Sequence, residues 1–278
     1  MCWSGQASAA LAVFGYTGAY LEYKKRCKYH QKWNDTYTLR AASIFYFSLM
    51  ETLQAVNYTV IDAPGLLNSF CSLLGYLHVA FQPFFTNFMM ISLIPKKRRE
   101  YWMKYVLFFS TISALAWLSR LVISPSLTGC FAEQCSPVIS MDSLLNLTIF
   151  CSKTVGCSQT SFLSYHGDWH IAWKWVLNNC SLGVFPYIFA VFILPCFYGT
   201  YLTVILLILC GPGISIFLST NPDEFGAVWC LIAIALVSSL KIPALEKILT
   251  VRSDSWKETW RLTSLWIYQS HKNFKRNF

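Results

Sequence analysis

The predicted fold rests on residues 39–58, LRAASIFYFSLMETLQAVNY, and residues 67–94, LNSFCSLLGYLHVAFQPFFTNFMMISLI. Both stretches are predominantly apolar and reach the ~20 residues that a helix needs to cross a bilayer. Glu51 lies within the first stretch and His78 within the second. Ionisable groups are costly inside a membrane, so they need partners there, and each is a functional-site hypothesis by default.

The composition extends this interpretation to the whole chain. Its 278 residues are 55% hydrophobic and 13% charged, with a mean hydropathy of +0.44, whereas soluble domains are about 25% charged. We therefore predict an all-α, seven-transmembrane helix bundle over residues 1–250, without a soluble domain. The first window lacks the basic region and cleavage site of a signal peptide, so we expect a retained helix. The predicted spans are 3–22, 39–58, 67–94, 103–124, 181–197, 198–218 and 225–249.

The basic residues predict an orientation. Of the 22 lysines and arginines, 17 lie in the segments 24–32, 96–104 and 247–276, and the net charge is +9. By the positive-inside rule, these segments are inside, the N terminus is outside and the C terminus is inside. We expect their partners to be membrane lipids, with anionic headgroups at the inner face, rather than nucleic acid.

Two further segments are expected at the membrane surface. The stretch 169–179, WHIAWKWVLNN, is Trp-rich and too short to span, which predicts an interfacial or re-entrant helix. The tail 251–278 is basic and Trp-rich, with tryptophans near helical spacing, and is predicted to be an amphipathic inner-surface helix. Within the spans, Pro83 and the run 210–213 (Cys-Gly-Pro-Gly) predict helix breaks.

Four cysteines fall in one predicted outer loop, residues 125–168. In an oxidising compartment they should form disulfides, with three connectivities open, and a zinc cluster is the alternative. The four are Cys130, Cys135, Cys151 and Cys157.

Polar residues in the second and third spans define the candidate ligand site. Glu51 and Gln54 share one helix face, as do His78 and Gln82. Helix rise brings both faces into the predicted outer half, and the run HGDWH places Asp168 and His170 near that end. The candidate ligand-binding residues are Glu51, Gln54, His78, Gln82, Asp168 and His170.

Three roles remain open for this set. Glu51 and His78 could pair and fix helix register, because polar contacts of this kind are common in bundles. They could instead form a transition-metal site with His170, since imidazole and carboxylate ligands suit zinc, iron or copper. The third role is a proton relay. No G-x-S-x-G, H-E-x-x-H, C-x-x-C or glycine-rich phosphate loop occurs, so the chemistries of those motifs are set aside.

Several blocks of the sequence resemble those of an uncharacterised multi-pass membrane family of unknown function, found in bacteria and some eukaryotes. The resemblance spans nearly the whole chain and implies the multi-pass topology without implying an activity. The blocks are MCWS at the start, SLMETLQAVNYTVID, GYLHVAFQPFF, GDWHIAW and LSTNPDEFGAVWC. The candidate site residues lie within them.

A second comparison is with the seven-helix lipid hydrolases that include the alkaline ceramidases, whose zinc site uses histidines of the last helix. This chain has no histidine in 225–249 and departs from them there.

The function predicted from the sequence is non-enzymatic binding of a small ligand, ion or lipid in an outer polar pocket of an integral membrane protein, with a bound phospholipid expected. One alternative is an accessory subunit of a larger membrane complex. Another is a metal-dependent intramembrane lipid hydrolase.

Overall fold

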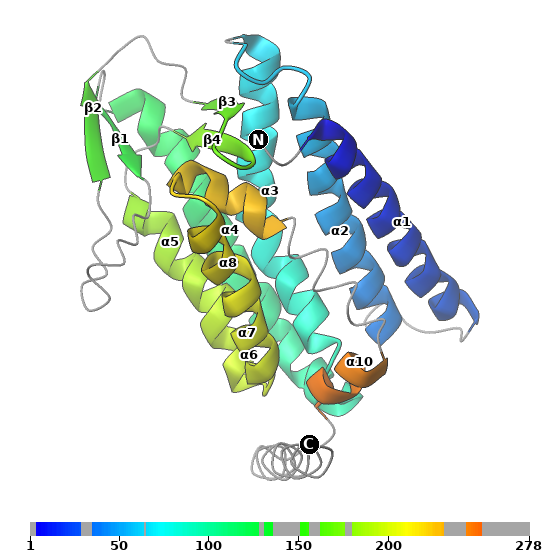
Figure 1. Cartoon of the computed structure of the whole chain (residues 1–278). Coiled ribbons are helices and arrows are strands. Elements are labelled where there is room, and N and C mark those ends of the chain that lie inside the picture. Colours follow the sequence, from blue (N-terminus) through cyan, green and yellow to red (C-terminus); the bar gives the residue numbers. More distant parts are fainter. Residues whose placement is uncertain are drawn as a thin grey trace, which may run out of the picture.

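The computed structural model describes residues 4–28, 35–63, 65–127, 131–135, 151–155, 162–175, 180–230 and 243–251. Four long helices come first: α1 (Gly5–Lys28), α2 (Thr36–Asn57), α3 (Leu66–Ile91) and α4 (Lys96–Leu127). Consecutive members of this series pack against each other (Figure 1). Asp35 begins α2, because its carboxylate accepts a hydrogen bond from the Thr38 backbone N–H at 2.9 Å.

Two further helical segments, each containing a π-helical turn, complete the bundle. The first contains α5 (Cys180–Ile188), a π-helical turn (Phe189–Ile193) and α6 (Leu194–Phe197). The second contains α7 (Tyr201–Ile208), a π-helical turn (Leu209–Gly213) and α8 (Ile214–Leu218). The predicted break at 210–213 is thus a π-helical turn within a continuous helical segment. Pro83 lies within α3 and does not end that helix. A 3-10 turn (Pro222–Glu224), the helical residues 225–230 and α10 (Pro243–Leu249) follow.

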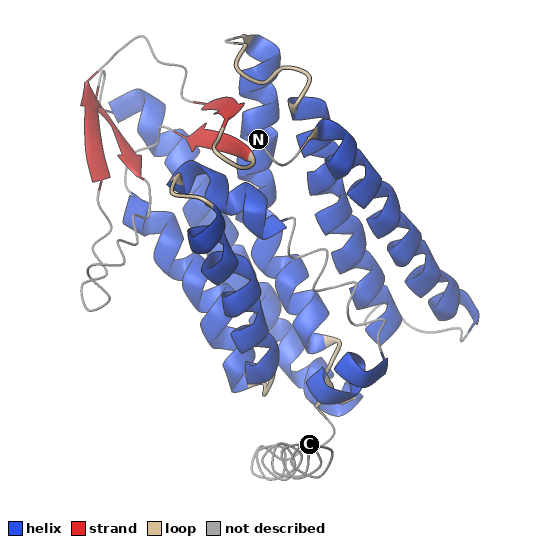
Figure 2. Ribbon diagram, in the orientation of Figure 1, coloured by secondary structure: helices blue, strands red, loops and turns tan. Residues whose placement is uncertain are grey.

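Two antiparallel hairpins lie at one end of the bundle (Figure 2). One pairs β1 (Phe131–Cys135) with β2 (Cys151–Val155), and the other pairs β3 (Phe162–His166) with β4 (Ile171–Trp175). The predicted surface helix over 169–179 is therefore wrong, because residues 171–175 of this stretch form strand β4. The Ile and Trp residues of IAWKW favour a half-buried strand, and β3 supplies its partner.

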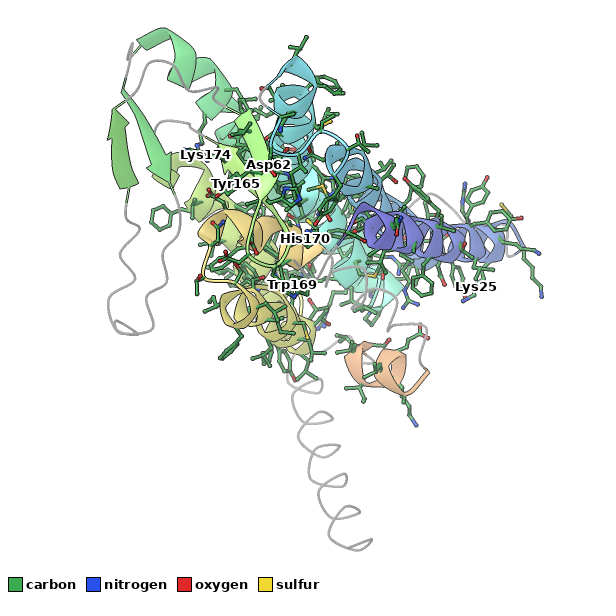
Figure 3. The ribbon with its side chains drawn as sticks, turned by 45° about the horizontal axis from the view of Figure 1, so that its top comes forward. Lys25, Asp62, Tyr165, Trp169, His170 and Lys174 are labelled. Atoms are coloured by element: carbon green, nitrogen blue, oxygen red, sulfur yellow. The ribbon has the colours of Figure 1, made fainter. Side chains whose placement is uncertain are left out.

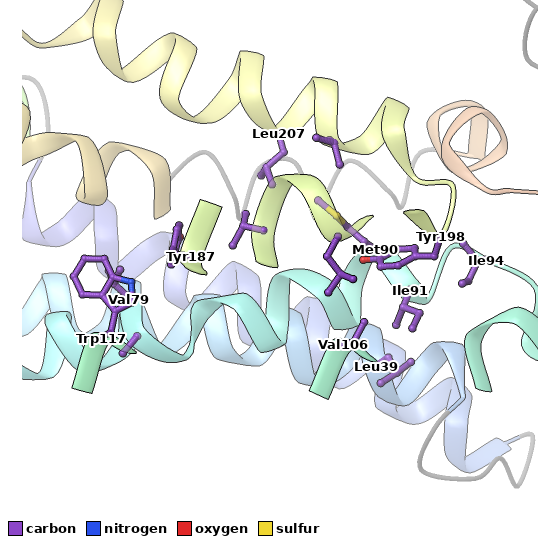
Figure 4. Packing of buried hydrophobic residues seen from close by; sticks show 14 of the residues in the cluster. Leu39, Val79, Met90, Ile91, Ile94, Val106, Trp117, Tyr187, Tyr198 and Leu207 are labelled. Carbon is purple, nitrogen blue, oxygen red and sulfur yellow. The ribbon is translucent and has the colours of Figure 1, made fainter. Parts of the chain in front are cut away.

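The main hydrophobic core runs along the middle of the bundle (Figure 4). Tyr76 and Tyr198 are completely buried there, and Trp117 packs edge-on against Tyr76 with ring centroids 5.2 Å apart. Polar groups of the core are bonded across helices: the Tyr76 hydroxyl donates to the Trp117 carbonyl, and the Tyr198 hydroxyl donates to the Asn87 side chain at 2.8 Å.

The prediction of a seven-transmembrane bundle is wrong for the residues that the structure describes. Only the stretch Tyr201–Leu218 among them is both long and apolar enough to cross a membrane, and Gly183–Phe197 is apolar but shorter. Helices α1 to α4 are long enough, at 24, 22, 26 and 32 residues, but polar side chains along them lower their hydropathy. The predicted orientation, with the N terminus outside, assumed seven crossings, so the described residues do not support it either. The basic tail over 251–278 lies outside the described residues, apart from Val251.

Candidate functional site

The β3–β4 hairpin closes one end of the helical bundle through a turn over residues 167–170. The Gly167 backbone N–H donates to the His170 carbonyl at 2.9 Å. A Cβ atom at Gly167 would stand only 1.7 Å from Oε1 of Glu224. The close approach of this turn to a carboxylate therefore requires glycine.

Glu224 is completely buried beneath this turn. Its carboxylate accepts hydrogen bonds from the backbone N–H groups of Trp169, at 3.2 Å, and His170, at 3.3 Å. Asp168 points out of the turn, is exposed, and accepts from the Thr220 hydroxyl at 3.2 Å. The predicted site residue Asp168 thus lies at the surface of the hairpin.

Hydrogen bonds between Asn68 and Ser164 join strand β3 to the start of α3. The Asn68 side chain accepts from the Ser164 backbone N–H at 2.7 Å and donates to the Ser164 carbonyl at 2.8 Å. It also donates to the Val60 carbonyl at 2.9 Å, and the Ser164 hydroxyl donates to Asn57 at 2.6 Å. The side chains of Asn57, Asn68 and Ser164 are all buried, and the backbone groups of Ser164 are satisfied without a neighbouring strand on this side.

Two more contacts hold the hairpin (Figure 3). Asp62 has a positive φ of 62° and accepts from the backbone N–H of His166 at 2.8 Å, and its other oxygen meets the His166 ring. Burial raises the pKa of Asp62, but the hydrogen bonds and the attraction of His166 outweigh it and hold the pKa below its usual value. The Tyr165 hydroxyl donates to Asp223 at 2.8 Å, and burial raises the pKa of Tyr165 to about 12.

His170 is completely buried beside the hairpin turn and above α2. Its Nδ1 lies 2.7 Å from the Ile171 backbone N–H and 3.0 Å from the Tyr58 hydroxyl. An Nδ1 that accepts from a backbone N–H leaves the ring proton on Nε2. Burial lowers the pKa of His170 to about 3, so the ring is neutral at physiological pH.

Glu51 and Gln54 occupy the interior between α1 and α2, and both are completely buried. Within the part of the chain that the structure describes, neither carboxylate oxygen of Glu51 and no Nε2 proton of Gln54 meets a hydrogen-bond partner. The hydroxyl of Ser8, on α1, donates to Gln54 Oε1 over a long 3.5 Å and also lies near the Glu51 carboxyl group. Glu51 and Gln54 thus share one helix face. The Glu51 oxygens and the Gln54 Nε2 group on this face lack a hydrogen-bond partner at normal geometry within the described chain.

His78 and Gln82 also share a face, on α3, but they contact other residues. The His78 ring stacks on Tyr46, with centroids 3.9 Å apart and planes 13° from parallel, and its Nε2 is another buried atom without a partner among the described residues. Gln82 accepts from the Tyr187 hydroxyl at 2.8 Å. No hydrogen bond joins His78 to Glu51 in the described chain.

The described residues do not assemble the predicted metal site. Within them, no three His, Cys, Asp or Glu side chains lie close enough to hold a metal ion. His170 bonds to Tyr58 and Ile171, and His78 stacks on Tyr46. The three predicted ligands Glu51, His78 and His170 therefore do not converge within the described chain. Glu51 and His170 do share a neighbour, because Tyr58 bonds to His170 and also lies near Glu51.

Two residues of this region were not predicted. Glu224 supports the hairpin turn from a distant part of the chain, and no local sequence pattern indicates that contact. Cys230 is a buried thiol packed with Met50 and Trp173 in the cluster that lies next to Glu51. A single cysteine in an apolar run gives no sequence signal of such a position.

The predicted disulfide loop is described only in part. Cys135 and Cys151 face each other in the register of β1 and β2, whereas Cys130 and Cys157 lie outside the described residues. The cysteines that the structure describes fully are free thiols, namely Cys27, Cys71, Cys196, Cys210 and Cys230.

These features define a class: a helical bundle with a polar interior, closed at one end by a hydrogen-bonded hairpin. The chain belongs to the family of unknown function DUF5765, whose model matches residues 6–250. This confirms the expectation of an uncharacterised family. No curated protein and no solved structure matches the chain.

Proposed function

We propose that the protein is an integral membrane protein that binds a small cationic or hydrogen-bond-donating ligand at Glu51, without catalysing a reaction. The observation that carries the proposal is the buried Glu51 carboxyl group, whose oxygens meet no hydrogen-bond partner at normal geometry within the described chain, although the Ser8 hydroxyl lies near it. Native proteins satisfy nearly all buried polar groups, so an exception of this kind needs an explanation such as a bound ligand or water.

The outer surface supports the membrane location. Large apolar side chains stand out from many helices, including Phe14 at 58% exposure, Leu66 at 89% and Phe217 at 80%. Polar side chains such as Gln54 and Asn87 are instead completely buried. Lipid would cover these exposed apolar side chains favourably.

The chemistry at Glu51 selects the ligand class. Two carboxylate oxygens require donors or a positive charge, and the Gln54 Nε2 group offers donors to an acceptor atom on the same ligand. An ammonium or hydroxyl group, or a monovalent cation that keeps some of its water, meets both demands. An anionic ligand would add a second buried negative charge and is disfavoured.

The test measures thermal unfolding of the protein in mild detergent with increasing sodium, potassium, methylammonium or choline chloride, at constant ionic strength. At least one probe should raise the melting temperature of the wild type in a saturable way. Glu51→Gln should abolish the rise. Glu22→Gln is the matched control, since Glu22 is also a buried glutamate but pairs with Lys25 at 3.1 Å, and it should keep the response.

Other outcomes would change the assignment. No response to any probe, or an equal response in wild type and Glu51→Gln, would contradict ligand binding at this carboxylate. Co-purification with a stoichiometric protein partner would favour the accessory-subunit alternative. Stoichiometric metal in elemental analysis would reopen the hydrolase alternative, which the described residues do not support.

A further inference from the structure

A groove of about 660 Å³ runs between α1 and α2 on the outer surface, away from the Glu51 interior. Its floor is made of the small residues Ala19, Ala41 and Ala42, and aromatic side chains flank it. Tyr20, Tyr23 and Phe45 are about half exposed or more, so the aromatic sides of the groove face outward. The groove falls within the 300–1,000 Å³ typical of small-molecule sites.

The dimensions of the groove suit one lipid chain. Along α1 it extends from Tyr16 to Arg26, roughly 15 Å at 1.5 Å per residue. That length is half of the ~30 Å hydrocarbon core of a bilayer, and so matches a single leaflet. The end near Tyr16 is lined by aromatic rings, because Tyr16 and Phe45 meet there with ring centroids 5.5 Å apart.

The other end of the groove is polar and positively charged. Arg26 lies over the Tyr23 ring at 5.6 Å, and Thr38 lines the groove from α2. The basic start of α4 lies at this same end of the bundle, because Arg99 donates to Thr36 at 2.6 Å. Figure 3 shows Lys25 at this end of α1, far from the hairpin residues.

We infer that this groove binds an anionic phospholipid, with one acyl chain between the aromatic side chains and the phosphate at Arg26. A guanidinium binds phosphate oxygens in a bidentate manner. The Thr38 hydroxyl already donates to Asp35 at 3.3 Å, so the charge of Arg26 carries the recognition of the phosphate. An uncharged sterol would fill the apolar part but leave the basic end unmatched. The inference rests on the membrane location proposed above and is independent of ligand binding at Glu51.

The test uses photo-crosslinking in vesicles that contain phosphatidylglycerol or phosphatidylcholine with the same diazirine-labelled acyl chain. Labelled peptides should map to residues 16–26 and 38–45, with at least fivefold more label from phosphatidylglycerol. Arg26→Gln should reduce this preference to near one. Lys24→Gln is the matched control, since Lys24 lines a separate hollow with Leu21, Lys25 and Lys28, and it should keep the preference.

A groove-filling change, Ala42→Phe, should remove the labelling by both lipids. Equal labelling by the two lipids, labelling spread over the whole outer surface, or equal effects of Arg26→Gln and Lys24→Gln would overturn the inference. A dimer crosslinked through this face would show that a second copy occupies it instead. Alkaline carbonate extraction separates the two proposals: release of the protein refutes the membrane location, whereas a retained protein without groove labelling refutes only the lipid site.

Discussion

The hairpin end and the Glu51 interior both bury polar side chains completely, yet they satisfy them differently. At the hairpin end, Glu224 accepts from two backbone N–H groups and Asn68 bonds to both backbone groups of Ser164. In the interior, Glu51 and the Nε2 group of Gln54 have no such partners in the described chain. The bonded groups at the hairpin end hold the fold, whereas we propose the Glu51 carboxyl group as a ligand site. The hairpin end is not complete in this respect, because the Asn57 Nδ2 group also lacks a partner within the described chain.

The hairpin end needs its bonds because it brings strand backbone onto a helical bundle. Each buried N–H and C=O of β3 and β4 must find a partner, and side chains of α3 and of the 3-10 turn supply what the two-stranded ladder lacks. No comparable backbone demand exists at Glu51, which lies in the middle of α2 where the helix satisfies its own backbone. The Glu51 side chain is therefore not needed to satisfy backbone groups.

The largest effect is expected from Gly167→Ala. The added methyl would overlap the Glu224 carboxylate and push it from its two N–H donors, which we expect to lower the free energy of unfolding by about 3 kcal/mol. Thermal unfolding in mild detergent measures it. Gly65→Ala is the control, since nothing lies within 4 Å of its added Cβ and its φ of −179° suits any residue. Equal melting temperatures of the two variants would show that the hairpin contact is dispensable.

The next effect compares two buried polar residues of α3. Asn68→Asp keeps the shape but loses the donor to the Val60 and Ser164 carbonyls, at a cost of about 2 kcal/mol. Ser72→Ala removes a buried hydroxyl that has no partner among the described residues, so its stability should be unchanged or higher. Urea or thermal unfolding of both variants tests the contrast. Similar losses would mean that Ser72 has a partner too.

A third effect depends on pH and concerns His170. Its folded pKa of about 3 lies below the unfolded value of about 6.5, so the unfolded state binds more protons between these values. The stability contribution is complete above pH 6.5 and falls as the pH decreases toward 3, by up to about 1.4 kcal/mol per unit. His170→Gln should have a smaller decrease in melting temperature between pH 7.5 and 5 than the wild type. Parallel decreases would show that other groups dominate.

The helices were largely predictable from the sequence, and the hairpin was not. The apolar runs 39–58 and 67–94 correspond to α2 and α3, because a long apolar run is a local property that can be read from the sequence. The stretch 169–179 was interpreted by its tryptophans alone, although IAWKW also fits a strand. A strand needs a partner distant in sequence, and β3 could not be located from local pattern.

The number of membrane crossings was the main error in the fold. Polar residues such as Asn68, His78 and Asn87 reduce the hydropathy of α3, and the prediction counted the apolar residues around them as a span. At the candidate site, the sequence correctly suggested that Glu51 shares a face with Gln54, and His78 with Gln82. It could not show that the two faces have separate partners, because that depends on how α2 and α3 pack.

The smallest effect on stability is expected from Glu51→Gln. Comparing this variant with Glu224→Gln tests the difference between the interior and the hairpin end most directly. Glu224→Gln replaces one oxygen with an NH2 group that cannot accept and leaves a single uncharged oxygen for the N–H groups of Trp169 and His170, which should cost about 1–2 kcal/mol. Glu51→Gln removes a buried carboxylate that has no hydrogen-bond partner within the described chain, so the free energy of unfolding should stay within about 0.5 kcal/mol or rise. Thermal unfolding without added ligand, at one pH and ionic strength, gives both values. If Glu51→Gln were the more damaging of the two, Glu51 would be a structural residue with a partner outside the described chain, and the interior would resemble the hairpin end rather than differ from it.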